Sequence, residues 1–218
     1  AFLELLRSRK VTVLNQTPTA FQGLLSEIVY QNDRGIFPDL SLKRVIFGGE
    51  ALNPAVLKEW FSVVGTQATL TNMYGITETT VHVTQRDYGS EHTDLPSALG
   101  NPIPGWLFNL RDGQGNAVLA NKTGEIHVGG AGVTRGYLNR PRLTAERFIP
   151  NPDGAAGSRQ YCAGDMARLD PQLGPIYAGR HDGQVKIRGF RIELGEIEAV
   201  LAGLTDIREA TVLATDAL

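Results

Sequence analysis

The stretch from Asn72 to Thr80, NMYGITETT, brings together residue types that suit a nucleotide site. The flat ring of Tyr74 suits stacking on a base, Thr77 offers a hydroxyl to a phosphate, and Glu78 offers a carboxylate to a Mg²⁺ ion that keeps most of its waters. By itself the stretch is equally typical of a threonine-rich turn that follows a strand and buries a tyrosine. The choice between these interpretations depends on the elements that position the stretch.

Strands and helices alternate up to this point in the chain. Phe2, Leu5 and Leu6 lie at helical spacing, and strands are expected at 11–14, 44–47 and 68–73. Thr17 and Pro18 should begin one helix, whose apolar face is formed by Phe21, Leu24, Leu25 and Ile28. Asn53 and Pro54 should begin another, whose apolar face is formed by Val56, Leu57, Trp60 and Phe61. The order predicts an α/β fold, a parallel sheet with flanking helices, over residues 1–93.

Ligands of such a sheet gather beyond the carboxyl ends of its strands. The residues there are polar or glycine: Asn15, then Gly48, Gly49 and Glu50, then Tyr74, Gly75, Thr77 and Glu78. Three separate places in the sequence are therefore predicted to meet in one crevice.

Short strands and frequent turns dominate residues 94–181. Strands are expected at 106–111, 124–128, 167–169 and 176–178, with a short helix from Thr144. This pattern of short strands and close turns indicates a small β-rich, antiparallel or barrel-like subdomain. After residue 182 we expect the start of a small α+β subdomain, with a helix over 194–201 and a strand over 210–214.

Gly179 to Glu198, GRHDGQVKIRGFRIELGEIE, is a basic, glycine-hinged segment that runs into an amphipathic acidic one. It is predicted to be a mobile connector feeding a helix, although a surface hairpin with a solvated charge run is the plainer alternative.

Composition excludes several classes of function. The 218 residues carry 21 basic and 23 acidic side chains, a net charge of -2, so neither nucleic acid nor a membrane surface is an expected partner. One cysteine, Cys162, cannot form an internal disulfide, and no apolar run is long enough to span a bilayer; a reducing cytoplasm is the expected location. The chain opens inside an expected helix without a start Met, and we expect it to be part of a longer polypeptide.

The twenty residues from Gly179 to Glu198 resemble the hinge motif of adenylate-forming enzymes, and most closely that of nonribosomal peptide synthetase adenylation domains. Tyr74 to Glu78, YGITE, resembles the family's nucleotide motif YGPTE with Ile76 in place of proline, and Gly48 to Glu50 resembles its GGE. Residues 124–148 follow the family's GELxxxGxGxxRGYLxRPxLTxERF pattern, in which no side chain obviously does chemistry. Tyr161 to Met166, YCAGDM, matches YRTGDL in part; Cys162 and Ala163 depart from it, which puts a phosphate contact there in doubt, and Cys162 is expected to be a packed residue.

The resemblance implies roles for individual residues. Gly49, Glu50, Tyr74 and Gly75 belong to the nucleotide site, Asp165 accepts hydrogen bonds from the ribose hydroxyls, and Arg180 supports the ribose and phosphate side. Thr77 and Glu78 are the catalytic residues, Glu78 as the metal ligand. Asp182 is the hinge about which the small subdomain swings, and Gly189 lies on the loop that approaches the carrier's pantetheine arm.

The same resemblance implies the reaction. A carboxylate attacks the α-phosphorus of ATP with Mg²⁺ present, pyrophosphate leaves, and a phosphopantetheine thiol on a peptidyl carrier protein domain then takes the acyl group. Residues 1–181 correspond to the later part of the large subdomain and 182–218 to the hinge and the start of the small one. The phosphate loop, the amine-binding Asp and the C-terminal Lys are not in the sequence, so these residues alone should be inactive. Neighbouring synthetase domains, and an MbtH-like protein, are implied partners; a stand-alone acyl- or aryl-CoA ligase and an inactive scaffold stay open as alternatives.

Six residues match the family's substrate-pocket positions through the flanking motifs: Asn15, Ile46, Gly48, Met73, Val81 and His82. In that order they resemble the pattern of threonine-activating domains. Gly48 leaves room near the β-carbon, and His82 with Asn15 can hydrogen-bond a hydroxyl, although a histidine satisfied at a strand edge is the plainer reading of His82 alone. The resemblance therefore implies L-threonine as the amino acid.

Overall fold

The computed structural model describes residues 1–35, 39–93, 96–182, 184–187, 190–205, 207 and 209–215. Its first sheet contains β1 (Val13–Gln16), β2 (Arg44–Phe47), β3 (Thr69–Tyr74), β4 (Thr84–Tyr88) and β5 (Asn101–Pro102), in that spatial order. β1, β2 and β3 run parallel, as the sequence predicted, but β4 and β5 add to them antiparallel, so the sheet is mixed. β4 was not expected from the sequence.

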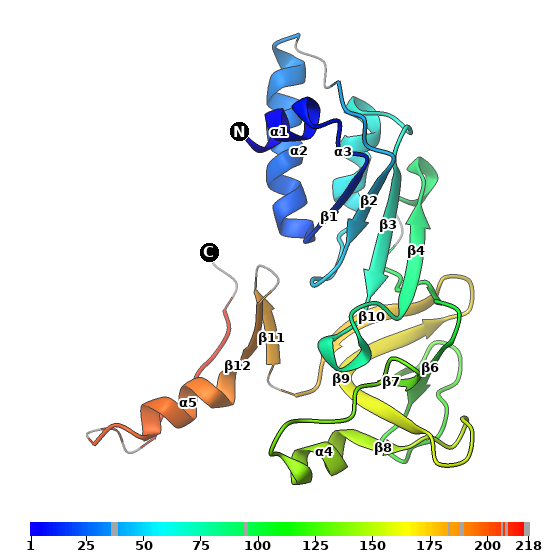
Figure 1. Cartoon of the computed structure of the whole chain (residues 1–218), viewed down its shortest axis with the longest axis vertical. Coiled ribbons are helices and arrows are strands. Elements are labelled where there is room, and N and C mark those ends of the chain that lie inside the picture. The colour runs from blue at the N-terminus through cyan, green and yellow to red at the C-terminus, as the bar shows by residue number, and fades with distance from the viewer. Residues whose placement is uncertain are drawn as a thin grey trace.

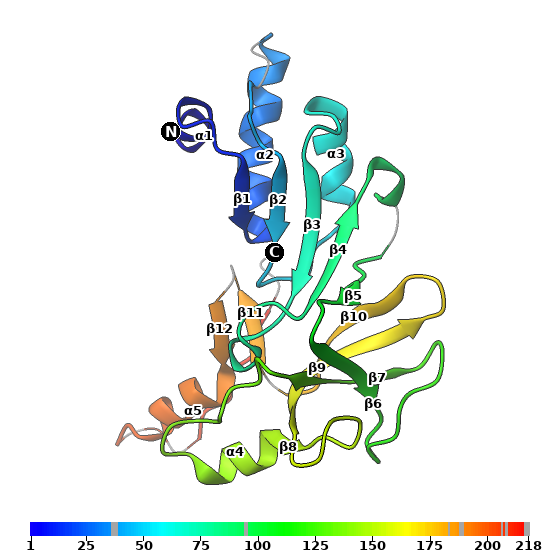
Figure 2. The ribbon, with the colours of Figure 1, turned by 45° about the vertical axis from the view of Figure 1, so that its right-hand side comes forward.

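The helices α2 (Pro18–Asp33) and α3 (Ala55–Val63) cover one face of this sheet (Figures 1 and 2). Thr17 caps α2 as predicted: its hydroxyl accepts a hydrogen bond from the Ala20 backbone N–H. The predicted apolar face of α2 packs with Leu57 and Trp60 of α3 against Val45 and Phe47. The helical spacing at the start of the chain is confirmed by the short helix α1 (Phe2–Ser8), which buries Leu3 and Leu6 and leaves Phe2 and Leu5 exposed.

The second sheet follows the order β10 (Gly174–Arg180), β9 (Arg159–Asp170), β7 (Thr123–Gly130), β6 (Trp106–Arg111), with β8 (Phe148–Pro150) also paired to β9. All its pairings are antiparallel and the order is linear. The helix α4 (Pro141–Arg147) precedes β8. A second apolar core forms around Ile126, Val128 and Tyr161 and reaches Tyr74 and Val83 of the first sheet, so the two sheets share packing at this end.

The stretch after β10 forms a hairpin of β11 (Gln184–Ile187) and β12 (Phe190–Glu193), followed directly by α5 (Leu194–Ala202). Both readings of the stretch therefore hold in part, since it is a hairpin and it feeds a helix. The hairpin lies between the two sheets while α5 points away from them (Figure 1). The strand predicted over 210–214 was wrong: no strand is present there, and the Val212 N–H donates to the Glu198 side chain instead of to a neighbouring strand.

Among the described residues, no helix is both long enough and apolar enough to cross a membrane.

Candidate functional site

Two adjacent pockets open beyond the carboxyl ends of β2 and β3, where the sequence placed a crevice. The first is lined by Gly49, Glu50, Ala51, Asn72, Met73, Tyr74, Gly75, Ser97, Leu99 and Tyr177. The second is lined by Gly49, Gly75, Ile76, Thr77, Val81, His82 and Arg191. Gly49 and Gly75 are common to both, so the pockets meet over these two glycines.

Gly75 cannot carry a side chain. A Cβ added there would lie 1.5 Å from the Val81 carbonyl oxygen, which is backbone and cannot move aside cheaply. Gly49 has φ +84°, a left-handed backbone that favours glycine. The floor shared by the pockets is therefore bare backbone, which lets a ligand approach closely.

Four of the six predicted substrate residues share one face of the first sheet. Asn15 pairs in register with Ile46 and Ile46 with Thr71. Gly48 and Met73 lie two residues further along their strands, and residues two apart point to the same face. This is the face opposite Val45 and Phe47, which pack under the helices. Asn15 and Ile46 do not line either pocket but lie farther back on the same surface.

His82 lies over Gly48. A Cβ added to Gly48 would come within 3.3 Å of His82 Nε2 and 3.7 Å of the Met73 carbonyl oxygen, so these three predicted residues are direct neighbours. Burial lowers the pKa of His82, which favours a neutral imidazole with one donor and one acceptor nitrogen. Val81 is 59% exposed at the pocket and has φ +72°, an unusual conformation for a β-branched residue.

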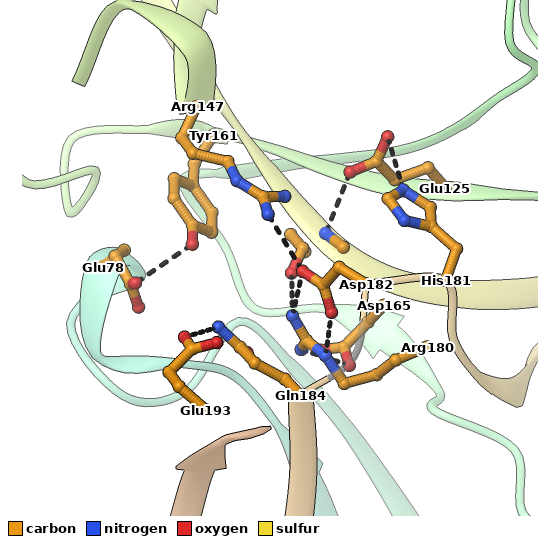
Figure 3. Close-up of polar contacts among 12 residues, drawn as sticks. Glu78, Glu125, Arg147, Tyr161, Asp165, Arg180, His181, Asp182, Gln184 and Glu193 are labelled. Carbon is orange, nitrogen blue, oxygen red and sulfur yellow. Dashed lines mark hydrogen bonds and ion pairs between the residues drawn. The ribbon is translucent and has the colours of Figure 1, made fainter. Parts of the chain in front are cut away.

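Asp165 is fully buried behind the first pocket and is held from three sides, of which Figure 3 shows the Arg180 side. Tyr74 donates its hydroxyl to one carboxylate oxygen at 2.8 Å; Tyr177 at 3.2 Å and Arg180 at 2.7 Å donate to the other. Burial and the neighbouring Asp165 charge raise the pKa of both tyrosines, so both stay protonated donors. The structure thus joins three predicted nucleotide residues, Tyr74, Asp165 and Arg180, into one network.

Asp182 continues this network at the entrance to the hairpin. Arg180 reaches both its oxygens, with Nε at 2.7 Å and Nη2 at 2.8 Å, and Arg147 of α4 adds a contact at 3.0 Å (Figure 3). The other predicted hinge residue, Gly189, lies outside the described residues.

Glu78 lies in the short 3₁₀ turn Thr77–Thr79 and is only 6% exposed. Tyr137 and Tyr161 donate their hydroxyls to Oε1 at 2.7 and 3.0 Å, while Nη1 of Arg191 contacts Oε1 at 2.9 Å and Oε2 at 2.7 Å. Burial by itself raises the pKa of Glu78, but the hydrogen bonds from Tyr137 and Arg191 outweigh it and the net pKa is lowered. Glu78 is therefore a carboxylate at neutral pH.

A Mg²⁺ ion fits the donor chemistry at Glu78. Within the described residues no group of three or more His, Cys, Asp and Glu side chains could hold an ion by itself. Mg²⁺ is typically bound through one or two carboxylates together with waters and substrate phosphates, so a lone ionised glutamate beside the pocket suits it. Arg191 shows that this carboxylate accepts a cationic group, and an ion would need that position.

Glu50 and Thr77 differ in their surroundings. Glu50 lines the first pocket, and its Oε2 also accepts a hydrogen bond from the Thr19 backbone N–H in the first turn of α2, at 3.0 Å. Thr77 is an exposed residue that lines the second pocket.

Cys162 is buried, and burial together with the Glu125 charge raises its pKa to about 11. It is a protonated thiol at neutral pH, as expected for a packed residue. The sequence pattern did not place a histidine beside it, but His127 Nδ1 lies 3.9 Å from its sulfur. The other face of His127 contacts Glu125, which also contacts His181 at the hinge.

The sequence missed Tyr177, Arg191, Tyr137 and Tyr161, all of which hold a carboxylate of the site. Tyr137, Tyr161 and Arg191 come from strands or loops 59, 83 and 113 positions from Glu78, whereas Tyr177 is 12 positions from Asp165 on the next strand. The available signal was weak: the last three lie inside stretches that matched family motifs but had no role assigned.

The sequence profile of the AMP-binding enzyme family matches residues 1–138. The chain is 49% identical over 207 residues, 93% of its length, to malpinin synthetase of Mortierella alpina. It is 47% identical over 216 residues, 98% of its length, to a dimodular nonribosomal peptide synthase of Bacillus subtilis (strain 168). It spans only 3% and 9% of these two relatives, respectively.

Solved structures agree. PA1221, described as an NRPS protein containing adenylation and PCP domains, is 25% identical with a TM-score of 0.84, over 99% of this chain and 42% of that one. AlmE of Vibrio cholerae, an adenylation domain solved with glycyl-adenosine-5'-phosphate, is 28% identical with a TM-score of 0.75, over 96% of this chain and 39% of that one. The chain belongs to the AMP-binding enzyme family, as part of an adenylation domain of the kind found in nonribosomal peptide synthetases.

Proposed function

We propose that the protein containing this chain activates L-threonine with ATP as an aminoacyl-adenylate and passes the threonyl group to the phosphopantetheine thiol of a carrier protein. A carboxylate oxygen of the amino acid attacks the α-phosphorus of ATP and pyrophosphate leaves. The carrier thiol then attacks the acyl carbon and AMP leaves, which leaves the acyl group in a thioester.

The observation that carries the proposal is the pair of pockets that meet over Gly49 and Gly75. A mixed anhydride has two parts, and each pocket has the character of one. The first has aromatic and polar walls in front of Asp165, which suits a nucleoside. The second has Val81 and His82, which suit a small side chain with a hydroxyl. AlmE, solved with an aminoacyl-adenylate, supports the same reading.

On the nucleotide side, Asp165 would accept hydrogen bonds from the ribose hydroxyls, a role that a carboxylate with two acceptor oxygens can perform. Hydrogen bonds from Tyr74, Tyr177 and Arg180 already orient this carboxylate, so little reorganisation is needed when the nucleotide binds. Arg180 keeps a positive charge beside this site, and Thr77 offers a hydroxyl at the junction to the second pocket.

Glu78 would hold Mg²⁺, which supplies positive charge as pyrophosphate leaves. Glu78 itself contributes a carboxylate whose Oε1 is oriented by two hydroxyls. The contact of Arg191 with both oxygens means that the Arg191 side chain must move away before an ion can use them.

The threonine assignment rests on His82, Gly48 and Val81. A neutral His82 can exchange a hydrogen bond with a β-hydroxyl, Gly48 has no side chain that would press on the His82 ring, and Val81 offers an apolar contact to a methyl group. A site that hydrogen-bonds a hydroxyl rejects the analogue lacking it by roughly 10⁴ to 10⁵, whereas fit around a methyl gives about 10 to 200-fold.

Transfer to the carrier would require the small subdomain to move relative to the large one. We place the boundary after residue 181: residues 1–181 belong to the large subdomain, and the hinge and the start of the small subdomain follow from residue 182. The Asp182 contacts with Arg180 and Arg147 support this reading, because they lie where the hairpin joins the body. We propose a carrier domain and neighbouring synthetase domains as partners, because the relatives are multidomain proteins. We also propose an MbtH-like protein as a partner and the cytoplasm as the location.

A pyrophosphate-exchange assay on the full-length protein tests the proposal. Threonine should exchange strongly, serine less, and valine least. His82→Ala should reduce the preference for threonine over valine, while His92→Ala, a histidine outside both pockets, should leave it unchanged. Equal exchange with valine and threonine would remove the threonine assignment, and exchange only with fatty or aryl acids would favour an acyl-CoA ligase.

A further inference from the structure

Residues 132–137, between β7 and α4, are held against the turn that carries Glu78. The Thr134 N–H donates to the Glu78 carbonyl at 2.9 Å, and the Thr80 hydroxyl donates to the Gly132 carbonyl at 2.7 Å. The loop is pinned at its far end too, since the Tyr137 N–H donates to the Thr144 hydroxyl at 3.0 Å. These contacts place the Tyr137 hydroxyl at the Glu78 carboxylate.

The Tyr161 hydroxyl reaches the same oxygen from β9 (Figure 3). The two hydroxyls also lie 3.0 Å apart, which makes three contacts for only two phenolic protons. At any moment at least one contact therefore lacks a proton, and either tyrosine can serve Oε1 when the other turns away. Oε2 receives neither tyrosine and meets Arg191 at 2.7 Å.

We propose that Tyr137 and Tyr161 are positioning residues that hold Oε1 of Glu78, so that Oε2 is presented to a divalent cation bound with the nucleotide. Arg191 occupies that place in this structure. The inference rests on the proposed function, because the cation arrives with ATP. It gives a role to residues 132–137, which sequence reasoning treated as purely structural.

The environment of the tyrosines fits this role. A phenol is protonated at neutral pH, so both hydroxyls can donate to the Glu78 carboxylate that they contact. Their rings pack on Phe148, with centroid separations of 5.4 and 4.9 Å. Phenylalanine in their place would keep this packing and remove only the hydroxyl.

The test measures Mn²⁺ binding to the full-length protein in the presence of a non-hydrolysable ATP analogue. Binding is monitored through the electron paramagnetic resonance signal of free Mn²⁺. Residues that orient a metal ligand typically change metal affinity by 10–100-fold when removed. Tyr137→Phe and Tyr161→Phe should each weaken Mn²⁺ binding by less than about threefold, because the remaining hydroxyl takes over. The double variant should weaken it by about tenfold or more, beyond the product of the single effects.

A second readout separates positioning from general damage. The double variant should need more Mg²⁺ for pyrophosphate exchange yet reach the wild-type rate at saturating Mg²⁺. Tyr88→Phe is the control: its hydroxyl is hydrogen-bonded to Ala98, away from Glu78, and its loss should leave Mn²⁺ affinity unchanged.

Wild-type protein that binds no Mn²⁺ with the analogue would overturn the proposed function as well. If the wild type binds Mn²⁺ and the folded double variant binds it with the same affinity, the tyrosine role alone is overturned. If the double variant does not fold, a single variant that loses the full tenfold, or a matching loss in Tyr88→Phe, still contradicts the shared-hydroxyl arrangement.

Discussion

Asp165 and Glu78 are two buried carboxylates with the same kind of partners, two tyrosine hydroxyls and one arginine. They differ in where the arginine belongs. Arg180 precedes the hairpin, is 6% exposed, and is anchored further by the Ala163 carbonyl and Asp182. Arg191 belongs to β12 of the hairpin and is 31% exposed. The Asp165 pair lies within the second sheet, whereas the Glu78 pair joins two parts of the chain.

The difference separates two tasks that a nucleotide enzyme must perform. A ribose acceptor has to be in place before the substrate arrives, so its counter-ion can be permanent. Under the proposed function, Glu78 would exchange Arg191 for a divalent cation, so its counter-ion would have to be able to move away. Four predictions test this contrast.

The largest expected effect is on stability. Asp165→Asn keeps the shape but removes one of the two carboxylates that face the buried Arg180. Breaking a buried pair typically costs about 3–5 kcal/mol of unfolding free energy, and we expect the low end of that range because Asp182 remains. Glu78→Gln should cost only about 1 kcal/mol, because Arg191 can turn toward water. Urea unfolding of both variants in the full-length protein measures the two costs. Equal losses would mean that the two carboxylates are held in the same way.

The hinge gives the next effect. Asp182→Pro fixes φ where the hairpin joins the body, so loading of the carrier thiol should fall at least tenfold while adenylate formation survives better. Asp182 also binds Arg180 and Arg147, and Asp182→Ala removes these contacts without fixing φ. If Asp182→Ala separates the two half-reactions as strongly as proline does, the contacts rather than the backbone set the effect.

Elements with local signals were predictable from the sequence. Thr17 and Pro18 marked the start of α2 because capping chemistry lies within a few residues, and β2 matched its β-branched run. β4 escaped because TQRDY buries only its two ends in a mostly polar sequence. The run at 210–214 looked like a strand, but a strand needs a neighbour to pair with and β-propensity does not supply one.

The candidate site was predictable only in outline. The strand-end rule brought Gly49, Gly75 and Thr77 to one crevice, because topology alone decides which ends meet. The partners of Glu78 were not predictable, since Arg191 is 113 positions away and no local pattern encodes that contact. The missed partners of Glu78 lie at motif positions to which no chemical role had been assigned.

A third carboxylate, Glu125, holds the backbone next to Asp165, and we expect this contact to affect how the stability of the protein depends on pH. Its Oε1 accepts from the Gly164 N–H at 2.8 Å, next to Asp165, and contacts with His127 and His181 help bring its pKa to about 2 despite burial. A lowered pKa contributes stability above the unfolded value, which is lost as pH falls from about 4.5 toward 2. Glu125→Gln should therefore be less stable by about 1 kcal/mol at pH 7 and lose less on acidification. Parallel stability curves for wild type and variant would contradict this effect.

The smallest effect concerns Arg191. It is partly exposed, so its pair with Glu78 is worth on the order of 1 kcal/mol, and Arg191→Gln should change stability by no more than that. If the same pair must open before a cation reaches Oε2, its loss should lower the Mg²⁺ concentration for half-maximal pyrophosphate exchange by about fivefold, since 1.4 kcal/mol is a factor of about ten. Arg142→Gln is the matched control, because Arg142 pairs with Glu146 on the exposed face of α4 at 2.9 Å and should leave the Mg²⁺ requirement unchanged. An unchanged requirement in Arg191→Gln would mean that the arginine and the cation do not compete, and the contrast between a permanent and an exchangeable counter-ion would then fail.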